Sequence, residues 1–113
     1  MENRIEKIKK MQKEKDVVIL AHYYVDGAVQ EIADYVGDSF YLSKVATQVT
    51  QQNILFCGVS FMGKSAKILN PEKNVVMADA HADCPMAHMV TVEQIEQVRK
   101  ENPDVAVVCY VNS

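Results

Sequence analysis

Four short apolar runs, each followed by polar residues, set the strongest limit on how this chain can fold. The runs are rich in Val and Ile, as buried strands are. They span residues 17–21, 53–57, 75–78 and 105–109. Helical patterns separate them, so neighbouring strands are expected to pair in parallel through right-handed crossovers. The sequence therefore predicts an α/β fold, a three-layer α/β/α sandwich with a four-stranded parallel sheet.

Helical periodicity fills the segments between these runs. Apolar residues recur at helical spacing among charged ones, which is typical of helices that cover a sheet. The predicted helices span residues 2–15, 28–36, 39–49, 60–69 and 91–101. Either Asp38 or Ser39 can cap the third of these helices. Thr91 and Gln94 form the pattern of a capping box at the start of the last.

Length and composition limit the class of protein. The 113 residues suffice for one compact domain, and 49% of them are hydrophobic, as in globular proteins. The net charge of −3 gives no electrostatic attraction for nucleic acid or an anionic membrane. The N-terminal end lacks the apolar core of a signal peptide, and no apolar run is long enough to span a bilayer. With cysteines only at Cys57, Cys84 and Cys109, the sequence predicts a cytoplasmic protein without a disulfide framework.

Polar residues follow each predicted strand at the point where it ends. They occupy residues 22–24, 58–60, 79–88 and 110–112. Because the carboxyl ends of parallel strands lie at one edge of an open sheet, these segments are expected to converge on a single ligand site. If the first strand continues beyond His22, Tyr23 points away from Tyr24.

Five potential metal ligands crowd into the segment after the third predicted strand. They are Asp79, His81, Asp83, Cys84 and His88. Thiolate together with imidazole or carboxylate is a ligand mixture that zinc, iron and iron–sulfur centres use. One cysteine cannot close a structural zinc site, and the sequence contains no C-x-x-C pair. From these residues alone, the segment is either part of a metal site or an ordinary polar loop.

A phosphate-binding pattern lies between the second predicted strand and the helix that follows. Residues 58–65 match G-x-x-x-x-G-K-[ST], and Asp79 ends the next apolar run as a magnesium-binding Asp does in such proteins. However, Phe61 and Met62 place bulky side chains where backbone N–H groups must wrap closely around a phosphate. The segment is therefore either a P-loop of a nucleotide-binding domain or a helix start that packs on the sheet.

Five motifs in register resemble a known family. They are LAHYY at residues 20–24, ADYVGDS at 33–39, FCGVSFM at 56–62 with AKIL at 66–69, ADCPMA at 82–87 and YVN at 110–112. In this order they resemble quinolinate synthase, and the resemblance covers nearly all of the chain. Gly63 and Lys64 stand where a small residue followed by an acidic one is expected, and this departure creates the P-loop match.

The resemblance implies an enzyme of NAD biosynthesis. The family condenses iminoaspartate with dihydroxyacetone phosphate to quinolinate, and the resemblance implies L-aspartate oxidase as a functional partner. It also implies three similar α/β/α domains around a pseudo-threefold axis, each contributing one cysteine to a shared [4Fe–4S] cluster. Residues 1–113 resemble the first of these as a single α/β/α domain. Such a domain alone is expected to be inactive and to self-associate through faces that are buried in the full-length protein.

The resemblance extends to individual site residues. Cys84 resembles the first cluster ligand. His22 and Tyr24 resemble the pair that reaches the substrate, His22 as an orienting donor and Tyr24 as a hydrogen-bonding or acid/base group. Three further residues resemble groups that bind substrate carboxylate or carbonyl oxygens, namely Ser39, Tyr110 and Asn112.

Two points lie outside this resemblance. His81 and His88 match no role in the family, and they are expected to be solvated or to support the metal ligand. A non-catalytic α/β module is a further alternative. It would bind a small carboxylate through His22, Tyr24 and Tyr110 without iron.

Overall fold

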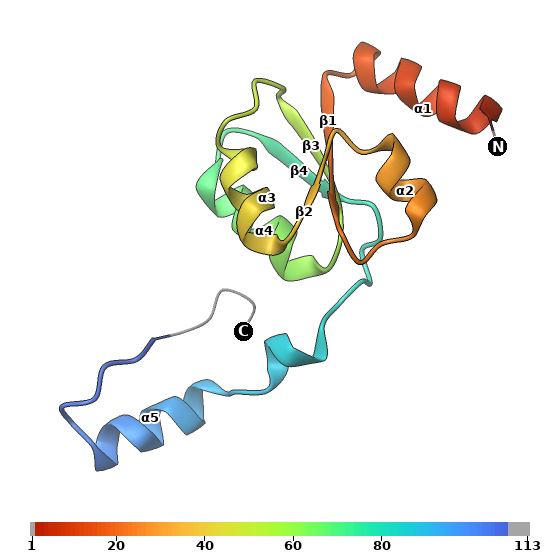
Figure 1. Cartoon of the computed structure of the whole chain (residues 1–113). Coiled ribbons are helices and arrows are strands. Elements are labelled where there is room, and N and C mark those ends of the chain that lie inside the picture. Colours follow the sequence, from red (N-terminus) through yellow and green to blue (C-terminus); the bar gives the residue numbers. More distant parts are fainter. Residues whose placement is uncertain (1, 109–113) are drawn as a thin grey trace.

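The computed structural model describes residues 2–108 and shows helices that alternate with strands (Figure 1). The elements are α1 (Glu2–Glu14), β1 (Val17–His22), α2 (Gly27–Ile32), β2 (Tyr35–Gly37), α3 (Ser39–Ala46), β3 (Asn53–Cys57), α4 (Ser60–Leu69), β4 (Asn74–Met77), the 3₁₀ helix η1 (Pro85–His88) and α5 (Val92–Glu101). Cys109, Tyr110 and Asn112 lie outside the described residues.

Four strands form one parallel sheet in the order β2-β1-β3-β4. Leu20 of β1 lies beside Tyr35 of β2 and Phe56 of β3, and Phe56 lies beside Met77 of β4. Parallel strands cannot be joined by tight hairpins, so each connection crosses over and contains a helix. The predicted α/β class with a four-stranded parallel sheet is confirmed.

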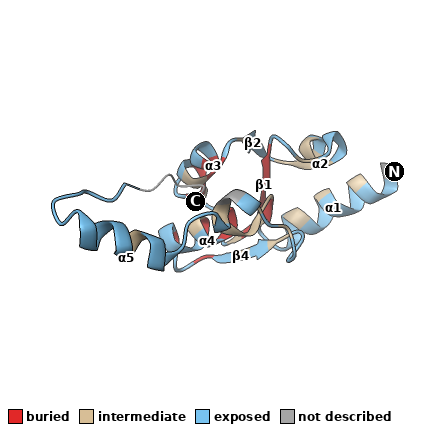
Figure 2. Ribbon diagram, turned by 90° about the horizontal axis from the view of Figure 1, so that it is seen from below, coloured by how far each residue is buried: buried red, intermediate tan, exposed pale blue. Residues whose placement is uncertain are grey.

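Alternate residues of β1 pack on opposite faces of the sheet. Val18 and Leu20 face the larger core, where buried side chains of α3 and α4 meet them. This core consists of Val18, Leu20, Leu42, Val45, Ala46, Ile54, Phe56, Met62 and Ala66. Ile19 and Ala21 face the other way and pack in a smaller cluster that includes Val29 of α2. Burial is accordingly concentrated on β1 and the elements beside it, whereas α5 is almost entirely exposed (Figure 2).

Strand β2 occupies residues for which the sequence predicts the end of a helix. α2 ends at Ile32, and Tyr35–Gly37 pair with β1 instead. Asp34 explains the difference, because its backbone N–H donates to Ile19 O (2.8 Å) and its carboxylate accepts the Ile19 N–H (2.8 Å). These bonds start the pairing with β1 and outweigh the local helical pattern. The predicted helix over residues 28–36 is therefore wrong in its second half.

The predicted strand at residues 105–109 is also wrong over the part that the structure describes. Residues 105–108 are exposed and belong to no strand. The preceding helix, α5, has no buried residue and extends away from the sheet (Figure 1). The chain is consequently 59 Å long, with a radius of gyration of 17.0 Å against about 13 Å for a compact chain of similar length. A crossover needs its helix packed on the sheet, and α5 is not packed there.

Val45 and Val98 offer a matched test of this arrangement, because both are helical valines but their exposed fractions are 7% and 49%. We expect Val45→Ala to lower the free energy of unfolding by about 2 kcal/mol, since it removes apolar contacts and leaves a cavity. We expect Val98→Ala to change it by less than about 0.5 kcal/mol. Urea denaturation measures both values. Equal losses would show that α5 packs on the core.

Candidate functional site

A cleft of ≈ 580 Å³ lies at the carboxyl ends of β1, β3 and β4. The polar and thiol side chains that line it are His22, Tyr24, Cys57, Asp79 and Cys84. Apolar side chains, among them Val29, Phe61 and Met62, complete the lining. Ligands of open parallel sheets bind at this edge. Three of the four segments predicted to converge thus meet here, and the fourth, residues 110–112, lies outside the described chain.

His22 ends β1 and is only 8% exposed. Its Nδ1 accepts a hydrogen bond from the backbone N–H of Tyr24 (3.2 Å), so Nδ1 carries no proton. Burial lowers the pKa of His22, and the nearby charge of Asp38 offsets this only in part. The ring is therefore neutral near pH 7, and its proton lies on Nε2, which becomes a hydrogen-bond donor.

Tyr23 and Tyr24 form one aromatic group with His22. The centroid of the His22 ring lies 4.7 Å from that of each tyrosine, and the two tyrosine centroids are 4.3 Å apart. The Tyr23 hydroxyl donates a hydrogen bond to the Tyr24 hydroxyl (3.1 Å). The condition under which Tyr23 would point away from Tyr24 is not met, because β1 ends at His22 and the alternation of an extended strand stops there. Tyr24 is 78% exposed, so its hydroxyl is accessible to a ligand.

Hydrogen bonds from α2 and β2 hold this turn in place. The Tyr23 N–H donates to Gly37 O (3.0 Å), and the Val25 N–H donates to His22 O (3.0 Å). The Gln30 amide donates to both Tyr23 O and Val25 O, each at 2.9 Å. The direction in which the rings leave the sheet is therefore fixed by neighbouring elements. The sequence did not identify Gln30, because a single polar residue on a helix carries no distinctive signal.

The segment after β4 brings Cys84 to the cleft. The Ser60 N–H, at the start of α4, donates to Ala82 O (2.9 Å) and ties the segment to that helix. Cys84 is a free, half-buried thiol on the cleft wall. It precedes η1, whose last residue, His88, pairs with Asp83 (2.7 Å). The bond to His88, and then the bond from the Cys84 N–H, hold the pKa of Asp83 below its ordinary value.

Cys84 fits one position of a metal centre, but its neighbours do not complete a site. Within the described part of the chain, no group of three or more His, Cys, Asp or Glu side chains could hold a metal ion. The Asp83 carboxylate already binds His88 and a backbone N–H, and the Asp79 carboxylate accepts the His81 N–H (2.9 Å). The described residues of this segment are therefore not gathered into a self-contained metal site. One soft thiolate on a cleft wall suits a cluster whose other ligands come from elsewhere.

Among the remaining predicted site residues, the structure describes Ser39, which lies apart from this group. Ser39 is 6% exposed at the first position of α3 and is not among the described residues that line the cleft. Asp38 caps α3, because its carboxylate accepts the Tyr41 N–H (2.7 Å). Tyr110 and Asn112 fall outside the described range. The predicted residues that the structure brings together are His22, Tyr24 and Cys84.

The P-loop match does not form a phosphate-binding loop. α4 begins at Ser60, so residues 60–65 are helical. Gly63 lies inside this helix against β4, where an added Cβ would collide with the sulfur of Met77. This glycine therefore serves the packing of helix on sheet, and no backbone cradle for an anion surrounds it. The alternative of a helix start that packs on the sheet is the correct one.

The fold and the cleft define a class of protein, the α/β proteins whose ligand site opens at the carboxyl ends of a parallel sheet. Within this class, the family described as Quinolinate synthetase A protein matches residues 6–113. The chain belongs to this family. It is 66% identical over 108 residues to the quinolinate synthase of Fusobacterium nucleatum subsp. nucleatum. It is 54% identical to that of Clostridium perfringens (strain SM101) and 53% identical to that of Caldicellulosiruptor bescii.

These relatives are longer than the chain. The alignments cover 96%, 96% and 94% of the chain but only 36%, 36% and 35% of the three relatives. The chain therefore spans about a third of the length of the curated relatives that it matches. Their shared name, quinolinate synthase, is that of an enzyme. Among residues 2–108, no helix has the length and apolar character needed to cross a membrane.

The neutral state of His22 makes folding stability depend on pH. The unfolded residue titrates near 6.5 and the folded one lower, so the unfolded state binds more protons as the pH falls. This stabilisation is complete above pH 6.5 and is lost as the pH falls through the folded pKa. We expect the free energy of unfolding to decrease from about pH 7 to 5 and His22→Gln to reduce that slope. Denaturant titrations at several pH values measure the free energy of unfolding, and His81→Gln is the control. An undiminished slope in His22→Gln would contradict a lowered pKa.

Proposed function

We propose that this chain contains the first α/β/α domain of a quinolinate synthase, which condenses iminoaspartate with dihydroxyacetone phosphate to quinolinate in NAD biosynthesis. Membership of the family supports this, as does the 66% identity to the Fusobacterium nucleatum quinolinate synthase over 96% of the chain. The observation that carries the proposal is the convergence of His22, Tyr24 and Cys84 on one cleft at the carboxyl edge of the sheet.

His22 and Tyr24 supply hydrogen-bond donors to a substrate whose charge lies on carboxylate and carbonyl oxygens. The His22 ring is buried and held through Nδ1, so Nε2–H can donate with little loss of side-chain freedom. The exposed Tyr24 hydroxyl can donate to the substrate or exchange a proton with it. Apolar side chains that include Phe61 and Met62 form part of the cleft wall, and both interactions become stronger when the rest of the protein excludes water from the cleft.

Cys84 is the proposed ligand of one iron in a [4Fe–4S] cluster. Its thiol is free, half-buried and on the same cleft as the substrate-binding pair. When bound, such a cluster offers an iron without a protein ligand, which acts as a Lewis acid on substrate oxygens. Cys57 also reaches the cleft, but it is buried and its pKa is raised by burial, which disfavours the thiolate that iron requires.

The last part of the sequence supports a protein of several similar units. Residues 92–113 repeat the pattern of residues 5–25 with one residue inserted, as a helix, an apolar run and then polar side chains. Tyr110 and Asn112 occupy the positions in this repeat that His22 and Tyr24 occupy in the first. We infer that α5 opens a second unit, which brings both residues to the same substrate as oxygen-binding groups. Ser39 is proposed for a similar contact from the start of α3.

The cellular setting follows from the proposed reaction. L-Aspartate oxidase is the proposed functional partner, because oxidation of the aspartate amine yields the imine substrate. A cytoplasmic location is proposed with it, and no nucleic-acid partner is expected, because a net charge of −3 gives no electrostatic attraction for nucleic acid. Self-association of the isolated chain is supported by a second cavity of ≈ 650 Å³ on the sheet, lined largely by apolar side chains such as Ile8, Met11 and Val76.

Cys84→Ala and Cys57→Ala form a matched pair that tests the cluster ligand in the complete protein containing this chain. We expect Cys84→Ala to lose the visible absorption of the cluster and quinolinate formation, and Cys57→Ala to keep its iron. The isolated 113-residue chain is expected to show neither a stable cluster nor activity, because one thiolate cannot anchor the centre. Iron and sulfide analysis after anaerobic reconstitution measures this. Quinolinate made by the isolated chain would contradict the proposal.

Ligand binding separates this proposal from its alternatives. We expect no magnesium-dependent ATP binding by calorimetry, because residues 60–65 are helical. ATP binding that is lost in Lys64→Ala would indicate a nucleotide-binding domain instead. Tight binding of a dicarboxylate by the iron-free protein, unchanged in Cys84→Ala, would indicate the non-catalytic module.

A further inference from the structure

We propose that Asp83 and His88 are positioning residues, which hold the Cys84 thiol in the direction required of a cluster ligand. The inference rests on the proposed function for the identity of the group that Cys84 binds. Neither residue is among the described residues that line the cleft, so their role would be exerted through Cys84.

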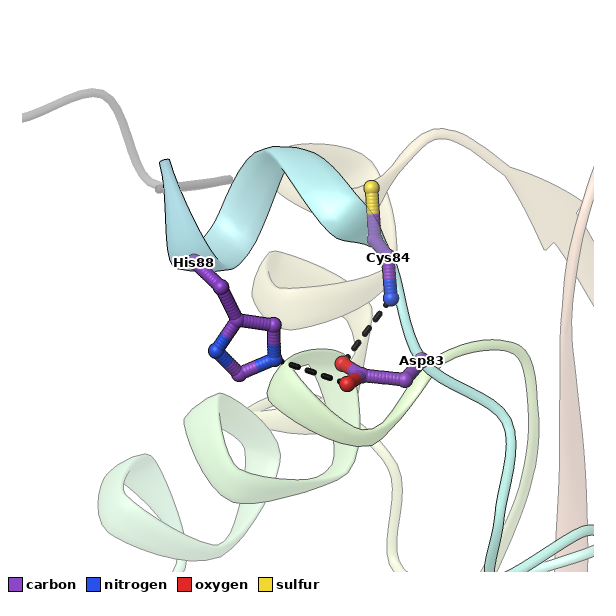
Figure 3. A network of polar contacts seen from close by, with 3 residues as sticks. All are labelled: Asp83, Cys84 and His88. Carbon is purple, nitrogen blue, oxygen red and sulfur yellow. Dashed lines mark hydrogen bonds and ion pairs between the residues drawn. The ribbon is translucent and has the colours of Figure 1, made fainter. Parts of the chain in front are cut away.

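The Asp83 carboxylate joins the two ends of the short segment that contains Cys84. Its Oδ1 accepts the backbone N–H of Cys84 (2.9 Å), and its Oδ2 lies 2.7 Å from Nε2 of His88 at the end of η1 (Figure 3). The two oxygens of one side chain thereby link the residue before the cysteine to the last residue of the 3₁₀ helix after it. The segment is closed on itself without using the thiol.

The backbone of Cys84 is held on both sides. Its N–H binds Asp83, and its carbonyl oxygen accepts the Ala87 N–H (3.0 Å). Pro85 follows directly, and its ring restricts the preceding residue to extended conformations. These constraints together set the direction of the Cα–Cβ bond of Cys84. Figure 3 shows the sulfur pointing away from the Asp83 carboxylate and the His88 ring.

The contact between Asp83 and His88 is too exposed to contribute much to folding. The two side chains are 50% and 66% exposed, and surface ion pairs add little stability. Hydrogen bonds behind a ligand act differently, because they orient it before the metal binds and so reduce what binding must order. An orienting role therefore predicts a change in cluster retention without a change in the unfolding of the cluster-free protein.

Substitutions in the complete protein that contains this chain test the proposal. Asp83→Ala removes both hydrogen bonds, whereas Asp83→Asn keeps an oxygen for the Cys84 N–H and an amide for His88. His81→Ala is the matched control, since it removes an exposed imidazole from the same segment. After anaerobic reconstitution, an iron chelator is added and the loss of visible absorption is timed. We expect Asp83→Ala to lose its cluster at least about 10-fold faster than the unmodified protein, with His88→Ala shifted in the same direction.

The other variants and the unfolding midpoints decide the interpretation. We expect Asp83→Asn and His81→Ala to retain the cluster as the unmodified protein does, and all four cluster-free variants to unfold at its midpoint. Slow cluster loss in Asp83→Ala, or equally fast loss in His81→Ala, would overturn the positioning role. Retention of the cluster in Cys84→Ala would show that the ligand assignment itself is wrong. Its loss there, with retention in Asp83→Ala, would remove only the positioning role.

Discussion

The structure depends above all on β1, which is paired on both edges and buried on both faces. β2 and β3 flank it in parallel, and every residue of β1 after Val17 is buried. Displacing it would open both clusters of the core at once. The position of His22 at the end of β1 is therefore held firmly, and the cleft begins at this residue. Because the other strands run in the same direction, they bring Cys57 and the segment that carries Cys84 to the same edge.

Features that follow from periodicity could be predicted from the sequence. The runs at residues 17–21, 53–57 and 75–78 match β1, β3 and β4 with ends that differ by no more than one residue. The capping box at the start of α5 could be predicted in the same way, because it involves neighbouring residues only. The positions of His22, Tyr24 and Cys84 at one edge followed from the order of strands and helices, since each lies shortly after an apolar run.

Features that depend on distant partners could not be predicted in this way. β2 forms because Asp34 bonds Ile19 of another element, and nothing within residues 28–36 reports that contact. The apolar run at 105–109 has the composition of a strand, but a strand also needs a neighbour, and α5 is not packed on the described sheet. The sequence did hold a signal here, because residues 92–113 repeat the pattern of residues 5–25. Under the proposed function, this repeat marks the start of a second unit.

The cleft contains side chains that are already held in place and others that are still exposed to water. Two of its residues are already held in place, since His22 is buried with a defined tautomer and the backbone of Cys84 is hydrogen-bonded on both sides. The cleft is still open to water, because Tyr24 is 78% exposed, and among the described residues Cys84 belongs to no group of three or more potential metal ligands. Donors aimed at developing charge are strong only where water is excluded. Under the proposed function, this domain therefore fixes the orientation of His22 and Cys84. Other parts of the protein provide the remaining thiolates and exclude water from the cleft.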